Sequence, residues 1–121
     1  MSYDGEGALM PSLQVRTDRH DPYVVITVLG DVDTTTIDHL QEQVKHAQRV
    51  SAHLLFDLAG MTFMDSAGIR VLLDAYNHAR ANQGTVAVCS PRPSPRKVME
   101  LVGLTDYIPV HDTLIEALTE L

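Results

Sequence analysis

The chain has 121 residues, of which 45% are hydrophobic and 21% are charged, and its formal net charge is −7. This length predicts one domain, and this composition is typical of a folded globular protein rather than a disordered one. The excess of acidic residues disfavours direct binding to nucleic acid or to an anionic membrane, because both carry the same sign of charge.

The sequence also favours a cytoplasmic protein. Its single cysteine, Cys89, cannot form a disulfide within the chain. No early apolar run follows a basic stretch, as it would in a signal peptide, and no apolar stretch approaches the ~18 residues of a membrane span. No pattern indicates an oligomeric state.

The first residues predict a tail and a β-hairpin. Residues 1–11 contain two glycines and a proline without hydrophobic periodicity, which predicts a flexible tail before a domain over residues 12–121. Alternating apolar and polar residues from Leu13 predict a short strand with one face in water. An Asp-Pro turn follows, and the continuous β-branched run 23–29 predicts a second strand that is covered on both faces.

The middle of the chain predicts two helices separated by a strand. After Gly30, apolar residues recur at spacings of three and four, which is typical of one face of a helix. The members of this first stripe are Ile37, Leu40, Val44 and Ala47. The apolar run 53–58 predicts a buried strand. A second helix is expected from Ile69 to near Gly84, a residue type that favours helix ends. Its stripe contains Ile69, Leu72, Leu73, Tyr76 and either Ala79 or Arg80.

The last third predicts two strands and two helices. Residues 85–90 are expected to form a strand, and residues 91–95 a loop, because three alternating prolines do not fit a helix interior. A short helix that stops at Gly103 follows. Its apolar residues are Val98, Leu101 and Val102. Residues 107–110 predict a brief edge strand, and a capping box beginning at Thr113 predicts the final helix.

The predicted order is therefore β-β-α-β-α-β-α-β-α. It indicates an α/β domain with a mostly parallel or mixed sheet of about five short strands and about four helices. In such folds, functional residues gather in the loops that follow the carboxyl ends of strands. Two of these loops, residues 30–36 and 59–68, carry acids and hydroxyl groups.

Enzymatic chemistry finds little support in these loops. Ser66 lies just before the second helix, but a hydrolase nucleophile elbow needs a glycine two residues earlier, where this chain has Met64. The chain has no phosphate-binding glycine motif, and its His, Cys and acidic residues lack the spacing of metal ligands. The sequence therefore predicts no catalytic residue, no cofactor and no metal.

Asp57 supports one alternative. An Asp at the end of a buried strand resembles the phospho-acceptor of a two-component receiver domain. That family also has an acidic pair after its first strand and a lysine, followed by proline, after its last strand. Lys45 and Lys97 lie in predicted helices and neither precedes a proline. Asp57 could equally bind neighbouring backbone amides.

A stronger resemblance covers nearly the whole chain. The segment TFMDSAGIRVLL, residues 62–73, resembles the phosphorylation loop and following helix of bacterial anti-sigma-factor antagonists, which are STAS-domain proteins. VLGDVDTTT, residues 28–36, resembles the G-E-[LI]-D segment of that family, with Asp31 in place of Glu. Residues 98–118 resemble its closing pattern. The chain departs from many members at Ala67, where they have Ser or Thr.

The resemblance implies a binding switch rather than an enzyme. In that family, the serine of D-S-x-G is phosphorylated, which corresponds to Ser66. The unphosphorylated protein would bind an anti-sigma factor that has serine-kinase activity and so free a sigma factor. Phosphorylation would end this binding, and a serine phosphatase would restore it. The expected partner-binding residues are Asp31, Asp33, Thr34, Thr35, Met64, Asp65, Ala67, Gly68 and Ile69. A STAS module of a stress-signalling assembly, or a nucleotide-binding STAS domain, remains an alternative.

Structural roles compete for several of these residues. Either Asp65 or Ser66 could cap the second helix, and Asp33, Thr34 or Thr35 could cap the first. Gly68 could admit a nearby backbone or nucleotide, or simply ease the turn into the helix. Core packing is expected for at least two of the apolar residues Met61, Met64 and Ile69.

The expected phosphate would change binding rather than folding. Phosphorylation adds about −1.5 to −2 charges, and the amino end of a helix favours an anion by ~0.3–1 kcal/mol. At an interface, the same charge beside Asp65 would cost several kcal/mol unless a cation matched it.

Overall fold

The computed structural model describes residues 12–120, so the predicted tail over residues 1–11 lies outside the described residues. The elements follow the predicted order β-β-α-β-α-β-α-β-α. The strands are β1 (Leu13–His20), β2 (Tyr23–Val32), β3 (His53–Met64), β4 (Thr85–Cys89) and β5 (Val110–His111). The helices are α1 (Ile37–Val50), α2 (Ser66–Ala81), α3 (Pro93–Leu101) and α4 (Leu114–Glu120), and a short 3-10 helix, η2 (Leu104–Asp106), precedes β5.

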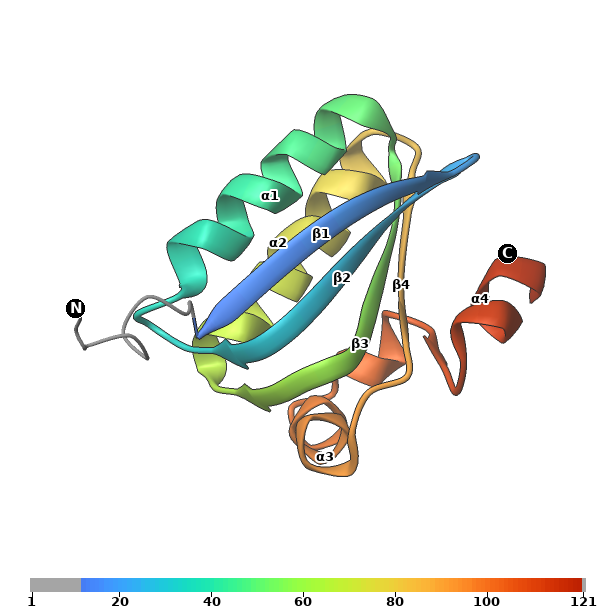
Figure 1. The fold of residues 1–121 in the computed structure, drawn as a ribbon. Coiled ribbons are helices and arrows are strands. Elements are labelled where there is room, and N and C mark those ends of the chain that lie inside the picture. Colours follow the sequence, from blue (N-terminus) through green and yellow to red (C-terminus); the bar gives the residue numbers. More distant parts are fainter. Residues whose placement is uncertain (1–11, 121) are drawn as a thin grey trace.

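One mixed sheet organises the molecule, with its strands in chain order from β1 to β5 (Figure 1). The hairpin partners β1 and β2 are antiparallel, and every later pair is parallel. Helices α1 and α2 cover one face, whereas α4 packs on the other face beside β4 (Figure 1). This arrangement confirms the predicted α/β fold class.

The two sides of the sheet bury different amounts of apolar surface. The larger core lies beneath α1 and α2 and includes Ile26, Phe56 and Val88, all fully buried. The smaller core joins Val25 and its neighbours to Ala117 of α4. Burial of a large aliphatic or aromatic side chain contributes about 1.5–3 kcal/mol, so the α1/α2 side supplies most of the hydrophobic stabilisation. Within residues 12–120, no helix has the length and apolar character needed to cross a bilayer.

The first part of each segment predicted as a loop is strand, which corrects that prediction. β2 continues to Val32 and β3 to Met64, and these two residues are parallel partners. Two register shifts between the strands interrupt the alternation of apolar and polar positions while the pairing continues. Such irregularities are typical of β-bulges. Because they break the two-residue alternation of side chains, the sequence pattern does not show where the strand ends.

α3 also differs from prediction. It begins at Pro93, inside the segment 91–95 that the sequence predicts as a loop. Both prolines of the helix occupy its first turn, where backbone N–H groups have no helical acceptor, so the prediction of a loop was wrong at this point. The apolar residues Leu101 and Val102 are 75% and 57% exposed, and Met99 provides the buried contact instead.

Candidate functional site

The carboxyl ends of β2 and β3 lie side by side, and α1 and α2 begin just beyond them (Figure 1). The backbone N–H of Asp65 donates to the carbonyl oxygen of Val32 at 3.1 Å, which joins the two chain segments directly. Residues 31–36 and 62–70, called the strand–helix junction below, therefore form one surface. The two functional segments selected from the sequence are thus adjacent in the structure.

Asp65 caps α2, and Ser66 is the first residue of the helix. The Asp65 backbone is extended, and its Oδ1 accepts a hydrogen bond from the N–H of Ala67 at 2.8 Å. The sequence allows either Asp65 or Ser66 to cap this helix, and in the structure the cap is Asp65. The Ser66 side chain is exposed to solvent on the first turn. An exposed hydroxyl at this point is accessible to an incoming phosphoryl donor.

The entrance to α1 is a compact turn held by its own side chains. Asp33 Oδ1 accepts hydrogen bonds from the N–H and the hydroxyl of Thr35, at 2.9 and 2.6 Å. The hydroxyl hydrogen bond from Thr35, reinforced by the backbone one, lowers the pKa of Asp33 from its ordinary value. Thr34 and Thr35 themselves are exposed on the surface of this turn.

Thr36, which the sequence analysis does not select, is the buried support of this turn. Its Oγ1 donates to the carbonyl oxygen of Asp31 at 2.9 Å and accepts from the N–H of Asp33 at 3.0 Å. It also occupies the N-cap position of α1, which corrects the expectation that Asp33, Thr34 or Thr35 caps this helix. A Thr immediately before an apolar stripe is the signal that could have identified it.

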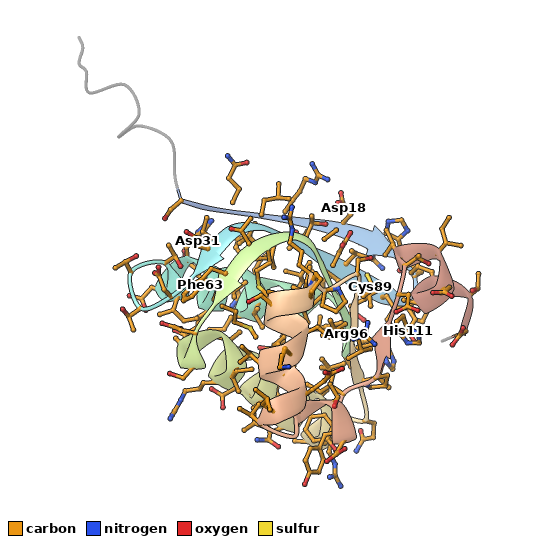
Figure 2. All side chains as sticks on the ribbon, turned by 90° about the horizontal axis from the view of Figure 1, so that it is seen from below. Asp18, Asp31, Phe63, Cys89, Arg96 and His111 are labelled. Carbon is orange, nitrogen blue, oxygen red and sulfur yellow. The ribbon has the colours of Figure 1, made fainter. Side chains whose placement is uncertain are left out.

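Asp31 contributes to the surface through the neighbouring strand. The hydroxyl of Thr62 donates to Asp31 Oδ1 at 2.6 Å. The register partner of Asp31 is Phe63, whose side chain is 49% exposed, and the two lie beside each other in Figure 2. Neither Thr62 nor Phe63 is selected by the sequence analysis, because their exposure depends on the shifted pairing of β2 with β3.

Gly68 lies beneath this surface. A Cβ on Gly68 would meet Met64 Cγ and would lie 2.9 Å from Met64 Sδ and 3.1 Å from Val32 Cγ1. The glycine therefore lets α2 pack closely on the two strand ends, a role different from both roles that the sequence suggests. Met61 and Met64 are also buried, which confirms the prediction that at least two of the apolar residues pack in the core.

The outer face of α2 continues the site beyond Ser66. A shallow hollow on this face is lined by Ser66, Ile69, Arg70, Leu73 and Asp74. Leu73 is 41% exposed, although the sequence places it in the buried stripe. The residues of α2 that are buried are Gly68, Val71, Leu72, Ala75 and Ala79. The hollow therefore combines apolar surface with one positive and one negative side chain.

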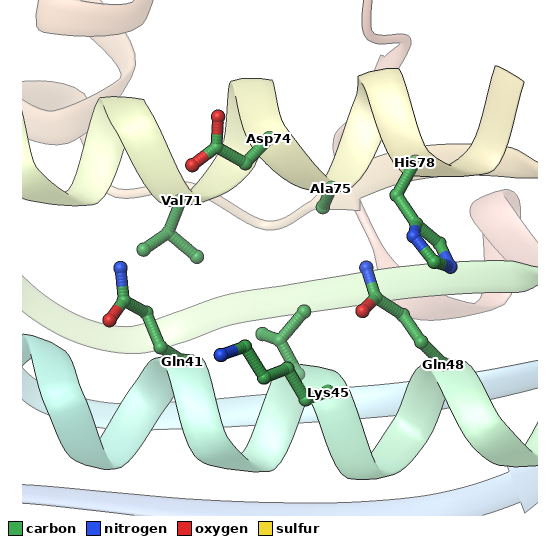
Figure 3. Close-up of a pocket in the computed structure, with 8 residues that line it drawn as sticks. Gln41, Lys45, Gln48, Val71, Asp74, Ala75 and His78 are labelled. Atoms are coloured by element: carbon green, nitrogen blue, oxygen red, sulfur yellow. The ribbon is translucent and has the colours of Figure 1, made fainter. Parts of the chain in front are cut away.

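A second hollow lies between α1 and α2, away from the junction (Figure 3). The polar side chains that line it come from both helices and include Gln41, Lys45 and His78. Within the described part of the chain, no group of three or more His, Cys, Asp or Glu residues could hold a metal ion.

Asp57 does not lie at the end of its strand. β3 continues beyond it to Met64, and its register partner in β4 is Cys89. Its Oδ1 accepts a hydrogen bond from the N–H of Ala59 at 3.1 Å, which is the structural role foreseen for it. Asp57 therefore lies beside the last residue of β4 but well before the end of its own strand.

Comparison with known proteins agrees with the resemblance seen in the sequence. Residues 14–117 match the family model of the STAS domain. An anti-sigma F factor antagonist of Paenibacillus polymyxa is 30% identical over 112 residues, which cover 91% of this chain and 96% of that protein.

Solved structures share the fold. The crystal structure of an anti-sigma factor antagonist from Mycobacterium paratuberculosis is similar, with a TM-score of 0.83 and 27% identity over 90% of this chain and 93% of that one. The Bacillus cell fate determinant SpoIIAA in its phosphorylated form has a TM-score of 0.71 and 23% identity, covering 88% and 98% of the two chains.

Proposed function

The chain belongs to the STAS-domain family, and from this membership we propose that it is an anti-sigma-factor antagonist switched by phosphorylation of Ser66. The unphosphorylated form binds an anti-sigma factor that has serine-kinase activity, and the sigma factor is released. Phosphorylation ends this binding, and a serine phosphatase restores it. The proposed partners place the protein in the cytoplasm and leave the catalytic chemistry to the kinase and the phosphatase.

One observation carries the proposal: the exposed hydroxyl of Ser66 at the start of a helix that is already capped. The hydrogen bond from Ala67 to Asp65 fixes the backbone on both sides of the serine. A kinase therefore meets the hydroxyl on an ordered backbone, and it does not have to break a cap in order to reach it.

The expected effect of the phosphate follows from the charges around it. The positive end of the α2 helix dipole favours the anion by ~0.3–1 kcal/mol, so the phosphoprotein stays folded. An interface would bury the same dianion beside the carboxylate of Asp65, at a cost of several kcal/mol. A loss of ~4 kcal/mol corresponds to about a thousandfold weaker binding.

We propose that the partner covers the exposed part of the strand–helix junction. Its apolar contacts are Phe63 and Leu73, which are large, solvent-exposed side chains on either side of Ser66 in the sequence. The polar contacts come from Asp31, Asp33, Thr34, Thr35 and Asp65, with Ala67 and Ile69 beside them. Gly68 and Met64 are buried, and they act by holding α2 against the strand ends.

A phosphorylation and binding experiment tests the proposal. Incubation with a cognate anti-sigma kinase and ATP, followed by mass spectrometry, should find one phosphate, on Ser66. Ser66→Ala should bind the kinase constitutively, whereas Ser66→Asp should bind at least about tenfold more weakly, a change of ~1.4 kcal/mol.

Ser94 offers a matched control, because it is an exposed serine in the first turn of α3. Ser94→Asp should bind like the wild type. Phosphate at another residue would contradict the assignment of Ser66. Equal affinity of Ser66→Ala and Ser66→Asp would contradict the electrostatic mechanism.

A further inference from the structure

Arg70 lies one helical turn beyond Ser66 on the same face of α2. Both side chains are exposed, and both line the hollow on that face. Residues four apart on a helix have their Cβ atoms about 5–6 Å apart, within reach of one another through a long side chain. The guanidinium can therefore approach the Ser66 oxygen without any movement of the backbone.

Two carboxylates lie near Arg70 in the sequence, and neither forms an ion pair with it. The Asp65 carboxylate is turned toward the backbone, where it binds the N–H of Ala67 at 2.8 Å. Asp74 lies one turn further along and lines the same hollow. Among residues 12–120, no carboxylate lies within 4.0 Å of the Arg70 guanidinium, so that group has no fixed ionic partner.

We infer that Arg70 is the counter-charge of phosphorylated Ser66 within the chain itself. The guanidinium turns toward the amino end of α2 and donates two N–H groups to two phosphate oxygens, a geometry that suits arginine better than lysine. The inference rests on the proposed phosphorylation of Ser66 and adds how the chain responds to it.

Two consequences for binding follow from this pairing. The phosphate adds negative charge where the partner would bind, and the pairing removes the positive charge of Arg70 from the same surface. A partner with an acidic group opposite Arg70 would therefore lose an attraction and meet a repulsion in one step. The pair also keeps the first turn of α2 ordered, because the phosphate is held to the next turn.

The test measures the second ionisation of the phosphate. Phosphoserine is installed at position 66 by genetic code expansion, and its pKa is followed by phosphorus NMR in the full chain. A nearby cation favours the dianion, so Arg70→Gln should raise this pKa by about 0.3 pH units, the equivalent of an exposed pair of ~0.4 kcal/mol. In the wild-type phosphoprotein, the Arg70 Nε–H resonance should also shift relative to the unphosphorylated chain.

Arg49→Gln is the matched control, since it removes the same charge from the last turn of α1. It should leave the phosphate pKa unchanged. Equal pKa values in the wild type and in Arg70→Gln, with no shift of the Arg70 resonance, would overturn the inference. Because the phosphate is installed without a kinase, failure of a kinase to modify Ser66 would count against the proposed function alone.

Discussion

Replacement of Gly68 by alanine tests how α2 is seated on the strands. Helix propensity alone predicts that Gly68→Ala stabilises the protein by ~1 kcal/mol. The structure predicts the opposite, because the new methyl group would meet Met64 Cγ and lie 2.9 Å from Met64 Sδ. Val32 Cγ1, at 3.1 Å, closes the other side of the space. Overpacking of this kind costs about 1–3 kcal/mol, and a clash near the base of the Met64 side chain belongs to the upper part of that range.

We therefore expect Gly68→Ala to lower the free energy of unfolding by about 1–2 kcal/mol after the gain in propensity is included. Urea unfolding followed by circular dichroism measures the change. Met64→Ala removes the atoms that the new methyl group would meet. The double variant should therefore lose less stability than the sum of the losses in the two single variants. A Gly68→Ala protein as stable as the wild type, or strictly additive changes, would refute the packing argument.

Three further measurements follow from the site and the core. Asp65→Ala removes the cap of α2 and should cost about 1 kcal/mol in urea unfolding, whereas Asp65→Asn should retain most of the stability. Because the folded pKa of Asp33 is lowered from 3.8, its contribution is present above that value and is lost as the pH falls through the lowered pKa. The urea midpoint of the wild type should therefore fall between about pH 6 and about pH 3 by more than that of Asp33→Ala. An equal fall in the two proteins would contradict the stabilising role of the Asp33 carboxylate. Burial, together with the charge of Asp57, raises the pKa of the Cys89 thiol to about 11, so an aromatic disulfide reagent at about pH 8 should react only after unfolding; rapid reaction of the native protein would contradict the burial of this thiol.

Local sequence patterns were sufficient to predict the helices and strands whose buried residues recur at a regular spacing. The stripe that predicts α1 is buried at Leu40, Val44 and Ala47, as a period of 3.6 residues requires. The end of β3 was not predictable in this way. Gly60 suggests a loop, but in the structure it gives room to the side chain of Leu29 in the neighbouring strand. That reason lies in the pairing of two distant segments and leaves no periodic signal in either of them.

The same distinction applies to the site. The sequence indicates that Asp65 and Ser66 stand at a helix start, but only the backbone shows that Asp65 is the cap. Leu73 continues an apolar spacing and is nevertheless exposed, because the buried face of α2 is centred on smaller residues. Phe63 was missed for a related reason, since its face of β3 is set by the register with β2.

The agreement between strand order and chain order has a consequence for synthesis on the ribosome. Each strand from β2 to β5 pairs with the strand made immediately before it. The sheet can therefore grow outward from the N-terminal hairpin as the chain emerges, and no strand has to wait for a partner encoded much later. At every stage the newest edge is covered by the next strand to be translated, which shortens the time during which a nascent chain exposes an edge to its neighbours.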